Sequence, residues 1–193
     1  MPSIAAHTYT NSAGRVDVLR KVAIDPRLRP ISRQDTQIYY HAALAALVAG
    51  WDAYINNVVR EFYGEVSNPL DVKFQAIYTV AQANSERTLG RFNTPNYENT
   101  RSLLISCTGY DPISDWVWSQ KNMGRRQVRE RLNEILQVRH SFAHGFSMPN
   151  CSWNESSSGH TRLTSKVIQD VEAFLSHLVN ATDMGLSQYS NSI

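Results

Sequence analysis

Apolar residues recur along the chain at helical spacing, and no segment alternates convincingly as a strand does. The strongest stripe follows Ser32 and Asp35, a pair that resembles a helix-capping arrangement, and the helix it predicts ends near 67–69. Within it, residues 42–49 are apolar on all sides, so we expect this helix to be central. The stripe consists of Ile38, Leu44, Leu47, Trp51, Tyr54, Ile55, Val58 and Phe62.

Weaker patterns predict further helices after the central one. Residues 91–96 are predicted to be a loop, because they are rich in Asn and include Pro95. Gly145 is predicted to end the helix that precedes it. The polar segment 147–159 is expected to be a loop. The predicted helices span about 71–89, 97–107, 112–119, 125–144 and 165–184, of which the second and third are short.

The beginning and end of the chain are predicted to lie outside the helical domain. Residues 1–33 look like an irregular N-terminal arm, because Pro26 and Pro30 interrupt them. We therefore predict an all-α fold with a single domain over 34–187 and a C-terminal tail over 188–193. The arm is basic, since Arg15, Arg20, Lys21, Arg27, Arg29 and Arg33 stand against Asp17 and Asp25.

Composition excludes several classes of protein. With 193 residues, 42% hydrophobic and 19% charged, the chain is long enough to bury a core and is neither disordered nor fibrous in composition. Cys107 and Cys151 are too few for a disulfide framework, and reduced thiols are expected. The first residues lack a signal-peptide pattern, and the longest apolar run is shorter than a membrane span. We therefore expect a cytoplasmic protein without a membrane partner.

Residues 128–145 carry the candidate chemistry. Arg139 occupies the position that completes the apolar stripe between Ile135 and Phe142. A guanidinium on a core-facing stripe is costly unless it is paired or lines a cleft. Two interpretations stay open, an internal ion pair with an acidic residue of the central helix or a functional cation. The rest of the stripe is Val128 and Leu132.

Two histidines accompany this arginine. His144 precedes Gly145 at the predicted helix end, where the helix dipole favours an imidazolium and an acid or base could act, although a capping histidine is the commoner role. His140 lies one turn earlier on the same face. This spacing can hold a metal, but no third ligand is evident, so neither a metal nor a cofactor is expected.

A basic cluster lies at the start of the same helix. Phosphate contacts from such residues would bind RNA without sequence choice, whereas the alternative is a solvated helix start. Positive charge at a helix N-terminus is not what the dipole favours, and this favours the functional interpretation. Trp116, Trp118 and Trp153 could stack on bases, although core positions are commoner for them. The cluster is Lys121, Arg125, Arg126, Arg129 and Arg131, against Glu130.

The motif Arg139-His-Ser-Phe-Ala-His144 fits the Arg-x4-6-His signature of HEPN domains. Over about 37–182 the chain resembles the RiboL-PSP-HEPN group, in HAALAALVAGWDAYINNVVREFY, FNTPNYENTRSLL, the Gly109-x5-Asp115-Trp116 segment and RHSFAHG. The resemblance implies an HEPN-type helical bundle with a long central helix and short extra helices. It also implies a homodimer in which two signature helices form a shared cleft.

Active HEPN domains are metal-independent endoribonucleases, a kind of hydrolase. By this resemblance, His144 would be the general base or acid at the ribose 2′-hydroxyl, and Arg139 would stabilise charge on the phosphate. His140 would help to orient the substrate. Asp52, or less favourably Glu61, would orient Arg139 or a histidine, the alternative for both being surface solvation. The RNA product would carry a 2′,3′-cyclic phosphate.

The resemblance implies a toxin or phage-defence effector that cleaves RNA, with an antitoxin or defence-system protein as a further partner. Phe146 stands where toxins paired with nucleotidyltransferase antitoxins carry a modified Tyr, which argues against that regulation. Two other hypotheses stay open. One is a catalytically silent HEPN domain that binds RNA or nucleotide or serves as a dimeric interaction module. The other is a purely structural helical protein with Arg139 in an internal salt bridge.

Overall fold

The computed structural model describes residues 1–25, 27, 32–67, 70–145, 147–155, 159 and 161–192. These residues form helices and contain no β-strand, only two isolated bridges, so the all-α prediction is confirmed. Two short 3-10 helices, η2 (Pro112–Ser114) and η3 (Ser119–Lys121), follow the fourth α-helix. The α-helices are α1 (Ile4–Val22), α2 (Arg33–Glu65), α3 (Val72–Leu89), α4 (Tyr97–Thr108), α5 (Arg125–Ala143) and α6 (Ser165–Ser190).

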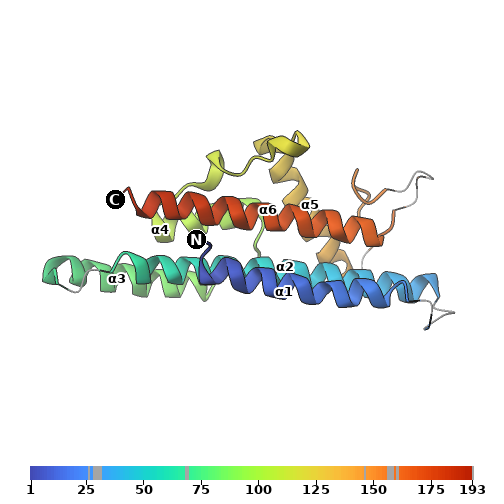
Figure 1. The fold of residues 1–193 in the computed structure, drawn as a ribbon, viewed down its shortest axis with the longest axis horizontal. Helices are drawn as coiled ribbons and strands as arrows, with labels where there is room; N and C mark the ends of the chain where they lie inside the picture. The colour runs from blue at the N-terminus through green and yellow to red at the C-terminus, as the bar shows by residue number, and fades with distance from the viewer. Residues whose placement is uncertain are drawn as a thin grey trace.

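The predicted central helix is α2. The Ser32 side chain accepts a hydrogen bond from the Asp35 N–H at 3.0 Å, which is the capping that the sequence predicts. Figure 1 shows α1 and α3 along α2 on one side of the molecule and α6 along the other. Because several helices cover α2, buried side chains recur along it from Tyr40 to Tyr63, with Trp51 and Ile55 fully enclosed. The predicted end at 67–69 is close to the observed one, although 68–69 lie outside the described residues.

The central helix also has the length and apolar composition of a membrane span. The segment Gln34–Glu65 reaches a mean hydropathy of 1.2, and half of the residues in its apolar window are buried inside the fold. The core helix of a soluble protein meets the same criteria, so this property does not assign α2 to a membrane.

The prediction of an irregular arm over 1–33 is wrong, because α1 is an ordered helix. Ser3 caps its first turn, and the Ser3 N–H donates to a carboxylate oxygen of Asp183 in α6 at 3.0 Å. Pro26 and Pro30, which carried the prediction, lie outside the described residues. The buried face of α1 is built mainly of alanine, which gives a weak apolar stripe. Its members are Ala5, Ala6, Tyr9, Ala13 and Val16.

The predicted C-terminal boundary also requires correction. The last helix does not stop at 184 but continues to Ser190, into the segment 188–193 that was expected to be a tail. Leu186 is buried, and Tyr189 packs against the core. Because α1 and the end of α6 contribute to the same hydrophobic cluster as α2, the domain extends beyond 34–187 at both ends.

The connection between α4 and α5 is tied to α6, and this fixes where α5 begins. Gly109 ends α4 with a φ of 78°, in the left-handed region that glycine tolerates. The Tyr110 hydroxyl donates to an Asp115 carboxylate oxygen at 2.5 Å. Trp116 is fully buried, and its indole N–H donates to the Thr182 hydroxyl at 2.9 Å. Trp116 is therefore a core residue and is unable to stack on a base.

Replacing Gly185 by alanine is expected to lower the free energy of unfolding by about 1–3 kcal/mol, as overpacking does. A Cβ at this position of α6 would collide with the Tyr110 hydroxyl and the Asp115 carboxylate. Gly64→Ala in α2 is the matched control, since nothing lies within 4 Å of its Cβ, and it should gain up to about 1 kcal/mol. Thermal unfolding followed by circular dichroism measures both, and equal changes in Tm would contradict the packing argument.

Candidate active site

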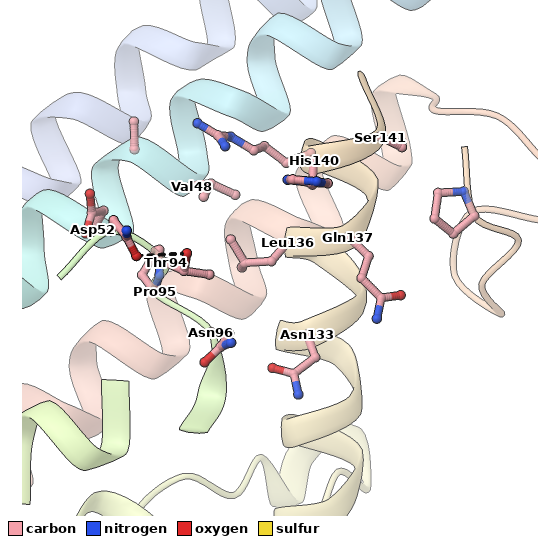
Figure 2. A pocket seen from close by; sticks show the side chains of 14 residues that line it. Val48, Asp52, Thr94, Pro95, Asn96, Asn133, Leu136, Gln137, His140 and Ser141 are labelled. Atoms are coloured by element: carbon pink, nitrogen blue, oxygen red, sulfur yellow. Dashed lines mark hydrogen bonds between the residues drawn. The ribbon is translucent and has the colours of Figure 1, made fainter. Parts of the chain in front are cut away.

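A cleft of about 580 Å³ opens between α2, the loop 91–96 and the C-terminal half of α5. Figure 2 shows Asp52 on the α2 side and His140 on the α5 side, with Val48 and Leu136 between them. Arg139 also lines this cleft. The structure therefore brings together three of the side chains that the sequence analysis singled out.

The end of α5 sets the positions of both signature histidines. The helix stops at Ala143, His144 is its C-cap residue, and Gly145 follows with a φ of 69°, as the sequence predicts. The rings of His140 and His144 have centroids 4.1 Å apart, so one helical turn places two imidazoles in contact. Both side chains are exposed. His140 lines the cleft, and His144 is next to the cleft because its ring contacts that of His140. No group of three His, Cys, Asp or Glu suited to a metal occurs among the described residues.

Arg139 leaves the core-facing stripe at the point where α5 emerges from the core. Leu132 and Ile135 are fully buried, as the stripe requires, but one turn later the buried residues are Val138 and Ser141 on a different face. Arg139 is consequently exposed, and among the described residues no carboxylate lies within ion-pair distance of it. Arg139 therefore lines the cleft and forms no internal ion pair among the described residues.

Asp52 supplies the negative charge of the cleft. Its side chain is half-buried, and burial raises the pKa of the carboxyl above its usual value. A hydrogen bond from the Asn56 amide at 3.2 Å and the positive charge of Arg139 both lower that pKa in part. Asp52 on α2 and Arg139 on α5 therefore attract each other electrostatically across the cleft.

Glu61 does not lie at the cleft. It accepts backbone hydrogen bonds from Ile4 and Ala5 at the start of α1, and burial raises the pKa of its carboxyl. The acidic residue that the sequence analysis weighed against Asp52 therefore caps a helix that the same analysis missed. The structure does not bring Glu61 together with Arg139.

The basic cluster divides between two faces of α5. Arg125, Arg126 and Arg129 line a second cavity, between α4 and the start of α5. Lys121 and Arg131 line a third cavity on the other side, together with Trp118 and Trp153. Helical spacing explains the division, because residue 131 is rotated by more than a third of a turn from both 126 and 129.

Lys121 and Arg131 already have aromatic partners within the chain. The Lys121 ammonium lies 5.9 Å from the Trp118 ring centroid, and the Arg131 guanidinium lies 5.2 Å from that of Trp153. Burial lowers the pKa of Arg131. Trp118 also stacks on His177 with centroids 4.9 Å apart. These rings therefore pack on neighbouring side chains, which does not favour their predicted role in stacking on bases.

Comparison with known protein families decides what kind of domain this is. A model of the RiboL-PSP-HEPN family matches residues 16–185. The chain belongs to the RiboL-PSP-HEPN family. No curated protein and no solved structure matches it. The family match begins within α1 and ends within α6, so it includes part of the helix that precedes residue 34.

Two further HEPN segments can be placed in the fold. The Gly109-x5-Asp115-Trp116 segment anchors the approach to α5. The HAALAALVAG segment lies in α2, where it contributes buried residues such as Leu44 and Leu47 and places Val48 at the cleft. Phe146, at the position of the modifiable Tyr in some HEPN toxins, lies outside the described residues.

In this HEPN domain, α2 also holds the end of α5 through a contact that the sequence analysis missed. The His41 and Phe142 rings stack with centroids 4.3 Å apart and planes within 6° of parallel. His41 is buried, its Nδ1 has no hydrogen-bond partner among the described residues, and burial lowers its pKa. The sequence did contain one signal for this contact. His41 is a polar residue at the start of the otherwise apolar run HAALAALVA. Phe142 lies between the two signature residues Arg139 and His144, so this stack positions them.

Acidification is expected to destabilise the HEPN domain through His41. An unfolded histidine titrates near pH 6.5, and the folded pKa is lower, so the unfolded state takes up the proton first. This contribution to stability is complete above about pH 6.5 and is lost as the pH falls through the folded pKa. His41→Phe retains an aromatic partner for Phe142 without titrating. Its Tm should therefore fall less than that of the wild type between about pH 7.5 and 5.5, and identical pH profiles would disprove the role of His41.

Proposed function

We propose that this HEPN domain is a metal-independent endoribonuclease that cleaves RNA through its own 2′-hydroxyl. The observation that carries the proposal is the contact of the His140 and His144 rings, 4.1 Å between centroids, next to an exposed Arg139 at the wall of a cleft. Two titratable rings and a fixed cation are the groups that this reaction requires. Membership in the RiboL-PSP-HEPN family supports the same conclusion.

The chemistry follows from these groups. One imidazole takes the proton from the 2′-hydroxyl, the 2′-oxygen forms a bond to the adjacent phosphorus, and the bond from phosphorus to the 5′-oxygen breaks. The other imidazole, as imidazolium, gives a proton to the departing 5′-oxygen. Arg139 stabilises the negative charge that develops on the non-bridging phosphate oxygens. The products carry a 2′,3′-cyclic phosphate and a 5′-hydroxyl, and no bound metal takes part.

Asp52 orients Arg139 in this proposal. Because the folded pKa of Asp52 lies above the unfolded value near 3.8, its charge reduces stability as the pH rises through the folded pKa. Asp52→Asn is therefore expected to leave Tm unchanged or higher at neutral pH, and to slow RNA cleavage by about tenfold or more. Thermal unfolding and cleavage rates of the same preparation test both effects. A variant that is less stable, or equally active, would contradict this role.

A homodimer completes the proposed site. Phe142 is 43% exposed at the end of α5, beside exposed Ala143 and His144, so a second copy can cover this end of the helix. Two signature motifs would then face one cleft, as the HEPN resemblance implies. We further propose that the protein acts in the cytoplasm as a toxin or phage-defence effector, with RNA as substrate and an antitoxin or defence-system protein as partner.

The experiment is cleavage of total RNA by the purified protein in excess EDTA, followed by analysis of the product ends. Cleavage with 2′,3′-cyclic phosphate ends is expected. Folded wild-type protein that binds RNA but releases no product would instead favour the silent binding module. Products that form only when a divalent metal is restored, or that carry 5′-phosphates, would contradict the proposed reaction.

A further inference from the structure

One face of α5 carries a continuous polar stripe from its first turn to its last. Its members are spaced by three or four residues, which places them above one another on a helix. Every one of these side chains is exposed or half-exposed. The basic start of the helix and the signature histidines therefore lie on the same face. The stripe is Arg126, Arg129, Asn133, Gln137, His140 and His144.

This face forms one wall of a groove. The catalytic cleft, about 580 Å³, includes Asn96 and Asn133, and the second cavity, about 650 Å³, includes Glu98 and Arg129. Asn133 lies between the two, where its side-chain oxygen accepts from the Tyr97 N–H at 3.0 Å and its amide donates to Glu98 at 3.0 Å. The groove along α5 is therefore crossed at this point by a contact between α5 and α4, with one cavity on each side of it.

The second cavity carries an excess of positive side chains. Four arginines line it and Glu98 is the acidic residue on its wall. Glu98 pairs with Arg129, and Asp111 pairs with Arg101 at 2.6 Å, so these two guanidinium charges are offset. Arg126 meets Glu130 at 3.5 Å between two well-exposed side chains, a contact of little energetic weight. Arg125 has no ion pair among the described residues. Arg125 and Arg126 therefore supply most of the uncompensated charge.

We propose that Arg125 and Arg126 bind backbone phosphates of the substrate RNA several nucleotides away from the bond that is cleaved. This inference rests on the proposed function and adds to it a requirement for length. Arg126 and His140 are fourteen positions apart on α5, which is about 20 Å along the axis. A single strand that occupies both cavities contacts both sites at once, so affinity rises with length while the chemistry stays at the histidines.

The test measures binding of a labelled 12-nucleotide single-stranded RNA to the full chain carrying His144→Ala, which prevents turnover. Adding Arg125→Ala and Arg126→Ala is expected to raise Kd at least tenfold. The slope of log Kd against log salt should fall by about 1.4, or about 0.7 for each lost contact. The matched control adds Arg15→Ala and Arg87→Ala, two exposed arginines on α1 and α3, and should change Kd less than twofold. Equal effects of the two pairs would overturn the proposal.

Two further measurements sharpen the test. Glu98→Gln retains the hydrogen-bonding shape but releases the charge of Arg129, so it is expected to tighten binding and to steepen the salt slope. With His144 intact, the Arg125/Arg126 double variant should lose much more activity on the 12-nucleotide RNA than on a dinucleotide, because so short a substrate does not reach the second cavity. A wild type that cleaves neither RNA nor dinucleotide would refute the proposed function, while the Kd comparison would still decide the role of the groove.

Discussion

Replacing His144 by alanine is expected to lower the rate of RNA cleavage by about 100-fold or more, the usual effect of removing a general acid or base. The side chain is exposed at the C-cap of α5 and touches the His140 ring, so its loss removes a proton carrier without opening the core. Affinity for RNA should change little, because the arginines of the groove remain. Single-turnover cleavage in EDTA, together with RNA binding, measures the two effects separately.

His7→Ala is the matched control for this variant. His7 is an exposed histidine on α1 that bonds only to Asn11 on the same helix turn, at 3.1 Å, among the described residues. It should cleave RNA at the wild-type rate. If His144→Ala retains wild-type activity with an unchanged Tm, His144 takes no part in the chemistry and the proposed proton transfer is wrong.

Replacing Arg139 by alanine is expected to slow cleavage by about 100- to 1,000-fold, as the loss of a preorganised donor at a developing charge does. The loss should appear in the rate at saturating RNA more than in affinity, because the charge that Arg139 stabilises develops in the transition state. The Arg139→Lys variant should also be impaired at least tenfold, since a point charge does not replace the planar fork of donors.

The control for both Arg139 variants is Arg15→Ala, which removes one exposed positive charge from α1. Circular dichroism should show intact helices in every variant, because Arg139 makes no ion pair among the described residues. If Arg139 instead had only a structural role, Arg139→Ala would lower Tm by several degrees. Activity of this variant would then return when it is measured well below that Tm.

Strong local signals made much of this fold predictable. The Ser32 cap, the wide apolar stripe of α2 and Gly145 after α5 each act within one or two helical turns. The structure confirms the cap, the glycine and every member of the stripe except Ile38, which is exposed. Arg139 was identifiable because it breaks an apolar stripe. The sequence alone did not explain why an arginine stands at this position. The structure does, because the buried face of α5 rotates toward Val138 before Arg139 is reached.

Weak or long-range signals explain what the sequence did not predict. α1 buries mostly alanine, which contributes little to an apolar stripe, and so it resembled an arm. Glu61 could not be separated from Asp52 as long as its partner, the start of α1, was unknown. The stack of His41 on Phe142 joins residues about a hundred positions apart, and no local pattern reports such a contact.

The basic cluster shows a different limit. Five positive residues within eleven positions resembled one RNA-binding surface, but a helix distributes neighbouring residues around its axis. The structure assigns Arg125, Arg126 and Arg129 to the cavity between α4 and the start of α5, and Lys121 and Arg131 to another. The density of positive charge along the sequence therefore predicted RNA as a partner, but it did not predict which surface of the helix would bind it.

The most direct test of the central claim changes the substrate and leaves the protein intact. A short RNA that the wild type cleaves in EDTA is compared with the same RNA carrying one 2′-deoxynucleotide on the 5′ side of the cleaved bond. If the 2′-hydroxyl is the attacking group, this bond survives while cleavage elsewhere in the strand continues. Cleavage of the deoxy-substituted bond at the original rate would contradict attack by the 2′-hydroxyl, and with it the roles proposed for Arg139, His140 and His144.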